Sequence, residues 1–179
     1  MPEPPTSDPA APDPALPGPR TPVVRVIDCH IARPAGERFE YLVLQRAPDR
    51  IDAAHWRIVT GKIEDGETAW QAALRELAEE TGLTPVRFFA VPYVNRFYEW
   101  QHDRINDIPV FLALVDLGAE PVLDREHVAH AWLAPDEAIA WLRWPGQRDG
   151  LAAAAALLDG HQHPRDSLEI PLEGDQPTR

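Results

Sequence analysis

Residues 61–83 read Gly-Lys-Ile-Glu-Asp-Gly-Glu-Thr-Ala-Trp-Gln-Ala-Ala-Leu-Arg-Glu-Leu-Ala-Glu-Glu-Thr-Gly-Leu. Three carboxylates, Glu76, Glu79 and Glu80, stand close together near the end of this stretch. On a helix, residues three and four apart lie on one face, where like charges repel and destabilise an isolated helix. A hard divalent cation would offset that repulsion, because magnesium prefers oxygen ligands and often bridges carboxylates to substrate phosphates. The stretch therefore indicates a metal site suited to phosphate chemistry.

The same stretch carries the signals of a helix that follows a glycine-containing loop. Thr68 with Gln71 three residues later is a capping-box pattern, and apolar residues recur after it at helical spacing. Gly82 stands where a helix commonly ends in a left-handed residue. Before the helix, the glycines at both ends of the loop 61–66 allow its backbone to approach a metal or a phosphate closely. The stretch predicts a loop, a helix and a short exit.

These residues resemble the Nudix box, which is a glycine, five residues, a glutamate, seven residues, and then Arg-Glu-aliphatic-any-Glu-Glu-any-Gly-aliphatic. All of the constrained positions match, and they are Gly61, Glu67, Arg75, Glu76, Leu77, Glu79, Glu80, Gly82 and Leu83. The resemblance implies an α/β/α sandwich with a mixed sheet, in which the box forms a loop-helix-loop. It also implies hydrolysis of a pyrophosphate bond with Mg2+ as cofactor, or Mn2+ as the alternative. The competing interpretation is a solvated acidic helix face, which explains neither the glycines nor Arg75.

The resemblance assigns roles within the box. Glu79 and Glu80 are expected as metal ligands, and Glu76 as a ligand or as the base that activates water. The backbone carbonyl of Gly61 is expected to face a metal. Arg75 is expected to pair with a carboxylate and hold the acidic face in shape, with an ordinary surface salt bridge as its alternative. The expected catalytic residues are thus Glu76, Arg75 and Glu80, while Glu67 is expected to steady the loop.

Residues outside the box complete the predicted site. Glu126, just before a predicted strand, is a candidate further metal ligand, with an exposed loop side chain as the alternative. Arg46, at the end of another predicted strand, is a candidate phosphate contact, with a solvated arginine as the alternative. The polar and aromatic segment 95–107 is typical of a substrate loop. The remaining candidate substrate contacts are Thr60, Phe97, Tyr98 and Trp100, whose aromatic members offer faces for base stacking, a contact worth about 1–3 kcal/mol.

Two further stretches resemble the branch of the family that hydrolyses dihydroneopterin triphosphate and dATP. They read Trp-Arg-Ile-Val-Thr-Gly at 56–61 and Arg-Glu-His-Val-Ala-His-Ala-Trp-Leu at 125–133. This resemblance implies that a small nucleoside or pterin triphosphate is cut to a monophosphate and pyrophosphate. Two alternatives stay open. One is hydrolysis of a dinucleoside polyphosphate of the Ap4A type, and the other is a non-catalytic Nudix protein that binds a nucleotide.

Composition bounds the partners and the location. The chain of 179 residues suits one domain with its own core. Its formal net charge of -12 argues against binding a nucleic-acid polymer or an anionic membrane, and no apolar run is long enough to span a bilayer. Cys29 is the single cysteine, so an internal disulfide is excluded and a reducing cytoplasm is the simpler location. The oligomeric state stays open.

The chain divides into one domain between two polar tails. Residues 1–22 carry nine prolines and predict a disordered tail. Residues 23–159 are the predicted Nudix domain, and residues 160–179 a loose C-terminal tail. Besides the box helix, the patterns predict strands at 23–32, 41–45, 56–60, 86–97, 110–117 and 127–133, and helices at 136–142 and 150–158.

Overall fold

A mixed sheet forms the middle layer of this computed structural model, which describes residues 21–48, 55–160 and 165–172. Its seven strands in the described residues are β1 (Val26–Ala35), β2 (Arg38–Arg46), β3 (Trp56–Arg57), β4 (Val59–Lys62), β5 (Arg87–Glu99), β6 (Arg104–Leu114) and β7 (His127–Leu133). β1 pairs in parallel with β6 and antiparallel with β2 and β4. The sheet is therefore mixed, as the resemblance implied.

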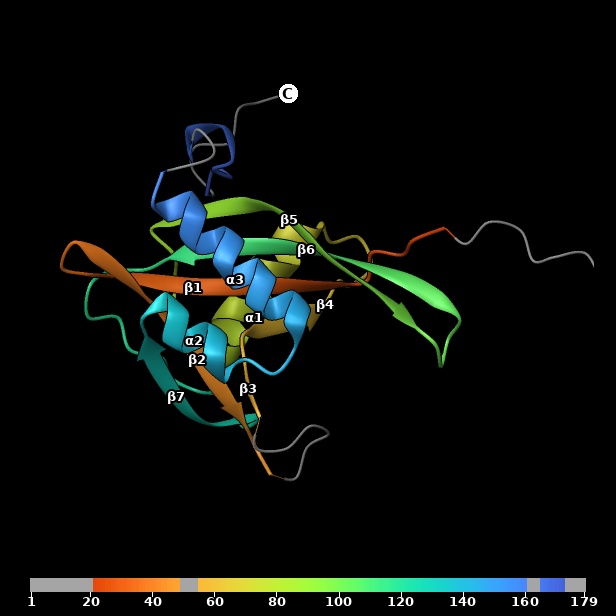
Figure 1. Cartoon of the computed structure of the whole chain (residues 1–179), viewed down its shortest axis with the longest axis horizontal. Coiled ribbons are helices and arrows are strands. Elements are labelled where there is room, and N and C mark those ends of the chain that lie inside the picture. Colours follow the sequence, from red (N-terminus) through yellow and green to blue (C-terminus); the bar gives the residue numbers. More distant parts are fainter. Residues whose placement is uncertain (1–20, 49–54, 161–164, 173–179) are drawn as a thin grey trace, which may run out of the picture.

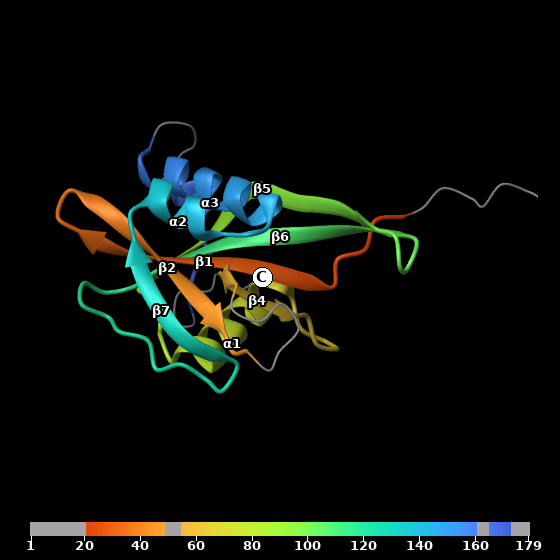
Figure 2. The ribbon, with the colours of Figure 1, turned by 60° about the horizontal axis from the view of Figure 1, so that its bottom comes forward.

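Helices cover both faces of the sheet (Figures 1 and 2). α1 (Ala69–Thr81) packs on one face, while α2 (Pro135–Trp141) and α3 (Pro145–Leu158) pack on the other. Side chains alternate between the faces of a strand, so Ile27 and Cys29 of β1 join the core beneath α1, and Ala32 joins the core beneath α3. The result is the predicted α/β/α sandwich. No helix in the described part of the chain has the length and apolar character needed to cross a membrane.

Helix α1 begins and ends where the sequence predicted. The side-chain oxygen of Thr68 accepts a hydrogen bond from the Gln71 amide at 3.4 Å, and Gln71 Oε1 accepts one from the Thr68 amide at 2.9 Å. Gly82 ends the helix with φ 65°, a left-handed conformation that suits glycine. Leu77 is fully buried against the sheet. This docking fixes the orientation of the whole acidic segment.

The strand predicted at 56–60 is two short strands with different neighbours. β3 pairs with β2, whereas β4 pairs with β1. Ile58 lies between them and is buried in the core beneath α2 and α3. This change of partner brings Arg57 back toward Thr60, whose hydroxyl accepts a hydrogen bond from the guanidinium. The break in the strand thus places Arg57 and Thr60 together, next to the box loop 61–66.

β5 and β6 form a long ribbon that projects beyond the helices (Figure 2). Their pairing runs out to Glu99 and Arg104, so β6 begins well before its predicted start at 110. The segment 95–107, which we expected as a substrate loop, forms the outer end of this ribbon. Helix α3 also begins earlier than predicted, because Pro145 occupies its first turn, where a missing N–H costs nothing.

The C-terminal segment differs from its prediction as a loose tail. Among its described residues, 165–172, the Leu168 carbonyl accepts the Ala90 amide at 2.9 Å, and the Ile170 amide donates to the Phe88 carbonyl at 2.8 Å. The leucine and isoleucine side chains of this segment pack on the two cores. The segment is therefore an added edge of β5. The predicted tail over residues 1–22 lies almost entirely outside the described residues.

Candidate active site

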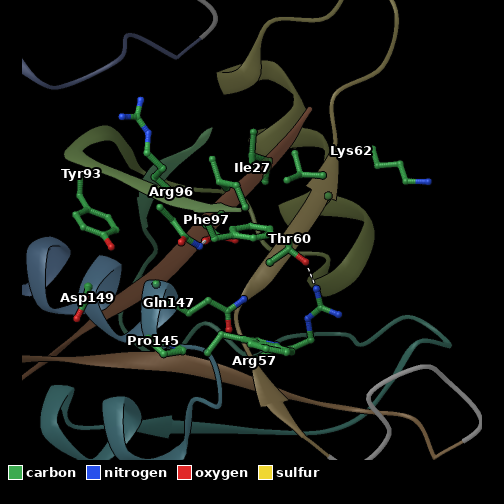
Figure 3. Close-up of a pocket in the computed structure, with 17 residues that line it drawn as sticks. Ile27, Arg57, Thr60, Lys62, Tyr93, Arg96, Phe97, Pro145, Gln147 and Asp149 are labelled. Atoms are coloured by element: carbon green, nitrogen blue, oxygen red, sulfur yellow. Dashed lines mark hydrogen bonds between the residues drawn. The ribbon is translucent and has the colours of Figure 1, made fainter. Parts of the chain in front are cut away.

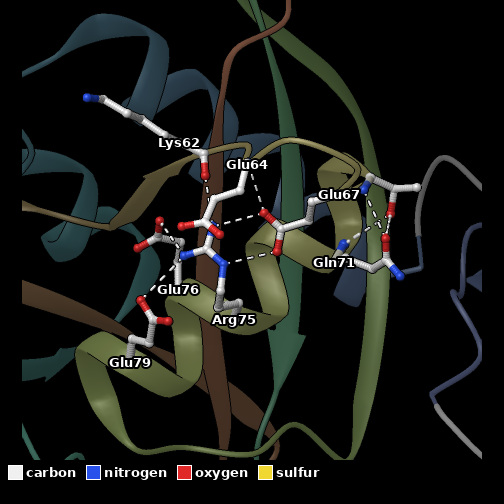
Figure 4. A network of polar contacts seen from close by, with 8 residues as sticks. Lys62, Glu64, Glu67, Gln71, Arg75, Glu76 and Glu79 are labelled. Carbon is white, nitrogen blue, oxygen red and sulfur yellow. Dashed lines mark hydrogen bonds and ion pairs between the residues drawn. The ribbon is translucent and has the colours of Figure 1, made fainter.

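Arg75 binds three carboxylates of the box at once (Figure 4). Its Nε and Nη2 donate to the two carboxylate oxygens of Glu67, each at 3.0 Å. Its Nη1 donates to Glu76 at 2.9 Å and to Glu79 at 3.3 Å, and its Nη2 also donates to the Lys62 carbonyl at 2.8 Å. The planar guanidinium suits such forked pairing. Arg75 therefore ties the loop to the helix, and Glu67 has the steadying position that we expected for it.

Gly61 lies directly against Glu76. A Cβ atom at position 61 would stand 1.9 Å from the carboxyl carbon of Glu76, so a larger residue would displace this carboxylate. Burial is the main influence on Glu76 and raises its pKa, while the hydrogen bond from Arg75 acts in the opposite direction. The Gly61 backbone and the Glu76 carboxylate are thus side by side, as the prediction of a shared metal requires.

Glu80 lies in a buried polar cluster with His127. Its side chain belongs to a residue only 8% exposed, and its Oε2 has no hydrogen-bond partner among the described residues. Nε2 of His127 is 4.0 Å from that oxygen and equally lacks a partner there, while Nδ1 lies 2.9 Å from Asp124 Oδ1. Burial raises the pKa of Glu80 to about 8, opposed by the nearby charge of Arg57.

Two arginines approach this cluster from β2 and β3. Arg46 Nη2 lies 3.3 Å from Glu126 Oε2, and the charge of Arg57 acts on Glu80. Nε of each arginine is buried without a hydrogen-bond partner in the described structure. A buried donor left without an acceptor costs free energy, and a phosphate oxygen is an acceptor that a guanidinium binds well. The structure thus brings together Arg46 and Glu126, two of the site residues predicted outside the box. It also places Arg57, which was not predicted as a site residue, beside the same cluster.

A cavity of about 730 Å³ opens on the α3 side of the sheet, next to the box loop (Figure 3). This volume is in the usual range for a small-molecule site. Thr60 and Gly61 of β4 line one part of it, and Gln147 of α3 lines another. Arg57, whose charge acts on Glu80, also lines the cavity. The cavity therefore adjoins the buried polar cluster of Glu80 and His127.

The structure brings only some of the predicted substrate residues to this cavity. Thr60 and Phe97 line it, whereas Arg46, Tyr98 and Trp100 are not among its lining residues. Tyr98 is 59% exposed and its hydroxyl donates to Asp103 at 2.9 Å, near the end of the ribbon. Asn95, Arg96 and Phe97 line the cavity in succession, so the cavity ends along β5 between Phe97 and Tyr98. Trp100 follows the end of the strand and is 74% exposed.

Several polar residues of the cavity had no role in the sequence analysis, and Asp28, Asn95 and Gln147 are among them. Asn95 lay inside the segment that we singled out, but without a role. Asp28 interrupts the apolar run Val-Ile-Asp-Cys-His-Ile at 26–31, and a charge in a buried strand is expensive enough to have marked it as functional. Burial raises its pKa to about 6, although the hydrogen bond from Asn95 opposes the shift. No sequence signal marks Gln147.

The donor set of the box fits a divalent cation. Among the described residues, no three His, Cys, Asp or Glu side chains converge into a group that could hold an ion, and Arg75 draws Glu76 and Glu79 to itself. Glu80 nevertheless keeps a buried oxygen without a partner in the described residues, and Gly61 leaves room beside Glu76. Oxygen donors of this kind are those that a hard cation takes.

Residues 22–154 match the NUDIX domain family. The chain belongs to this family, and it carries the domain found in pyrophosphohydrolases of phosphorus-containing anhydrides.

Three relatives show how broad the likeness is. The chain is 30% identical to an octanoyltransferase of Myxococcus xanthus over 75% of this chain, but spans only 38% of that protein. It is 32% identical to the asymmetrical bis(5'-nucleosyl)-tetraphosphatase of Sus scrofa, over 69% of this chain and 79% of the relative. It is 31% identical to the dihydroneopterin triphosphate diphosphatase of Escherichia coli K12, over 60% of this chain and 77% of the relative.

Solved structures agree on the fold. A Caenorhabditis elegans Ap4A hydrolase in a binary complex superposes with a TM-score of 0.65 at 24% identity, over 77% of this chain and 99% of the other. The Escherichia coli dihydroneopterin triphosphate pyrophosphohydrolase superposes with a TM-score of 0.60 at 26% identity, over 76% of this chain and 96% of the other.

Proposed function

We propose that this protein hydrolyses a pyrophosphate bond in a nucleoside triphosphate-like substrate, of the dATP or dihydroneopterin triphosphate type, and releases pyrophosphate and a monophosphate. The observation that carries the proposal is the junction at Gly61, which lines the cavity and also touches Glu76. A nucleoside or pterin in the cavity would lay its phosphates across β4 toward the carboxylates of α1. The proposed partner is thus a small molecule, and the single buried Cys29 favours a cytoplasmic location.

The residues of the chain then have distinct tasks. Arg57 and Arg46, each with a buried Nε that lacks a partner in the described structure, bind phosphate oxygens and orient the chain of phosphates. Arg75 fixes the positions of the carboxylates. Glu76, Glu79, Glu80 and the Gly61 carbonyl would hold the divalent cation, Mg2+ or alternatively Mn2+, which supplies positive charge where phosphoryl oxygens gain negative charge. Glu126 already pairs with Arg46, so we place it at the edge of this set.

Bond cleavage needs a base and a leaving group. The oxygen of a water molecule forms a bond to an inner phosphorus, and its proton passes to a carboxylate of the box. Glu76 suits this role because burial raises its pKa, and a base with a higher pKa takes a proton more readily. The bridging P–O bond breaks, and its electron pair leaves with the departing phosphate group. Positioning selects one phosphorus over its neighbour.

Hydrolysis of dATP in oxygen-18 water tests the proposal. We expect dAMP and pyrophosphate by mass, with the oxygen-18 in one of them identifying the phosphorus attacked. Activity should be lost with EDTA and return with excess Mg2+. Activity that survives complete chelation would refute the metal requirement, and dADP with orthophosphate as main products would refute the assigned bond.

A second candidate function is hydrolysis of a dinucleoside polyphosphate. The 32% identity to the Sus scrofa tetraphosphatase over 79% of its length favours it. Cleavage of diadenosine tetraphosphate to ATP and AMP, without hydrolysis of any triphosphate, would establish this candidate. Nucleotide binding without any hydrolysis would instead support a non-catalytic role, which the complete set of box carboxylates disfavours.

A further inference from the structure

The inner part of the cavity presents hydrogen-bond acceptors from two distant parts of the chain. Asp28 comes from β1 and Gln147 from α3. We infer that these two residues read the 2-amino-4-oxopyrimidine edge that guanine and reduced pterins share. The inference deepens the proposed function and rests on it for the direction in which the phosphates lie.

Asp28 is a carboxylate that is buried but incompletely bonded. Its residue is 3% exposed. In the described structure its hydrogen bond comes from Asn95 Nδ2, at 3.1 Å from Asp28 Oδ2, and Arg57 acts on it only through its charge. A buried carboxylate normally has several donors around it. Because Asp28 lines the cavity, ring and amino N–H groups of a ligand are suitable additional donors.

Asn95 holds Asp28 in place. A Cβ atom at Gly146 would stand 1.9 Å from Asn95 Oδ1, so the Asn95 amide is packed against the first turn of α3 while its nitrogen donates to Asp28. The helix therefore blocks movement of the Asn95 amide toward α3, while the hydrogen bond to Asp28 directs its nitrogen. The Asp28 carboxylate can therefore accept further hydrogen bonds from a fixed direction, as a selective binding site requires.

Gln147 supplies the second acceptor. Its residue is 6% exposed, and its Oε1 is buried without a hydrogen-bond partner among the described residues. Figure 3 shows the Gln147 side chain reaching from α3 into the same space as Phe97. Phe97 lines the cavity and keeps 45% of its surface exposed, so it offers a face for stacking a ring. An amino group between Gln147 and Asp28 would satisfy both acceptors.

This pattern of acceptors distinguishes between bases. Guanine and a 2-amino-4-oxopteridine present a ring N–H next to an amino group, which matches a carboxylate and an amide oxygen. Hypoxanthine lacks the amino group, and adenine turns a ring nitrogen lone pair toward the position of the carboxylate. A site built for a donor rejects the analogue that lacks it, because its acceptors are then left buried and unpaired.

The first test compares kcat/KM of the full chain, with Mg2+, on dGTP, dITP, dATP and dihydroneopterin triphosphate. We expect dGTP to exceed dITP by about 10- to 100-fold, the equivalent of one hydrogen bond to a charged group. A larger kcat/KM for dihydroneopterin triphosphate than for dGTP would identify the pterin as the source of the edge, and the reverse would identify guanine. Equal rates on dGTP and dITP, or a preference for dATP, would overturn the inference.

Variants separate recognition from support of the fold. In Asp28→Asn and in Gln147→Met we expect the dGTP to dITP ratio to fall toward one. Asp116→Asn removes the same charge from an exposed loop and should keep the ratio of the parent protein. If kcat/KM falls by the same factor on dGTP and on dITP in both cavity variants, Asp28 and Gln147 have a purely structural role and the inference is overturned.

Calorimetric binding of dGMP, dIMP and dAMP distinguishes failure of the inference from failure of the proposed function. Selective binding of dGMP, without hydrolysis of any triphosphate, would support the cavity inference and refute the proposed function. Hydrolysis of triphosphates combined with equal binding of the three monophosphates would do the reverse.

Discussion

Glu80 Oε2 and His127 Nε2 face one another at 4.0 Å, and neither atom has a hydrogen-bond partner among the described residues. Asp124 accepts the proton of His127 Nδ1, so Nε2 presents its lone pair toward Glu80. Burial is the largest influence on both groups, and it raises the pKa of Glu80 while lowering the pKa of His127. When Glu80 is ionised, the pair leaves a gap between two acceptors in a buried setting. A cation or a proton donor would fill it, so the prediction of Glu80 as a metal ligand can be tested through the residues around it.

The Asp124–His127 pair should act as one unit in support of Glu80. We expect His127→Ala and Asp124→Ala each to lower kcat/KM with Mg2+ by about 10- to 100-fold, the usual loss when a residue that supports a metal ligand is removed. The double variant should be little worse than either single one, because the two residues share one role. A magnesium titration of all three variants provides the measurement.

His130→Ala is the matched control. His130 lies on the same strand but bonds to Glu120 at the surface, and its variant should keep the activity of the parent protein. Additive losses from His127 and Asp124 would show that the two residues act separately.

Replacement of Glu80 by glutamine should separate activity from stability. Glu80→Gln keeps the shape and removes a charged ligand, so we expect turnover to fall by about 100-fold or more at saturating Mg2+. In EDTA its melting temperature should not fall, because burial already disfavours the charged carboxylate at this position. Glu137→Gln, on the exposed side of α2, should change neither quantity. Turnover within a few-fold of the parent would contradict the assignment of Glu80.

Replacement of Arg75 by lysine tests whether its role depends on the forked guanidinium. A lysine keeps the charge but cannot bind Glu67 through two parallel hydrogen bonds and Glu76 at the same time. We expect Arg75→Lys to lower the free energy of unfolding by about 1–2 kcal/mol and to lower kcat more than Arg38→Lys, which changes an exposed arginine. Urea unfolding and steady-state kinetics measure the two effects. If both lysine variants behave like the parent protein, Arg75 makes only an ordinary surface salt bridge.

The sequence predicted the box well because its signals are local. The capping box, the left-handed glycine and the acidic face all lie within one helix and its ends, where spacing alone decides which side chains meet. The pairing of Arg75 with carboxylates followed from the same short stretch. The fold class then followed from the resemblance that these residues carry.

The rest of the site depends on contacts that no local pattern shows. Asp28 and Gln147 line the same cavity because β1 pairs in parallel with β6 and α3 packs on that face of the sheet. The position of Tyr98 depended on where along β5 the cavity ends, which the pattern of side chains in the strand does not show. The strand at 56–60 divides at Ile58 because two different strands compete for its backbone, a tertiary effect that overrides local propensity.

Removal of residues 1–20 should leave the domain unchanged. Their proline content gives them few apolar groups to bury, and we expect the same melting temperature and kcat/KM as for the full chain. Removal of residues 1–25 is the informative comparison, because Val23 pairs with β6 and the Arg25 carbonyl accepts the Ile63 amide at 2.9 Å. The longer deletion should lower the melting temperature. A large drop with the shorter deletion would show that the proline-rich segment packs on the domain.

The stability of the protein should depend on pH through Asp28. Its pKa rises from an ordinary 3.8 to about 6 on folding, because burial outweighs the hydrogen bond from Asn95 and the charge of Arg57. The folded state therefore holds this proton more tightly than the unfolded state, so the contribution to stability is present below pH 3.8 and is lost as the pH rises through about 6.

Asp28→Asn removes the charge and keeps an acceptor for Asn95. We expect it to raise the free energy of unfolding by up to about 3 kcal/mol at pH 7.5, and by about 1 kcal/mol at pH 4.5. Urea unfolding in EDTA at both pH values measures the difference, with Asp116→Asn reporting the effect of losing one exposed charge. A gain that is the same at both pH values, or larger at pH 4.5, would show that burial of Asp28 does not oppose its ionisation.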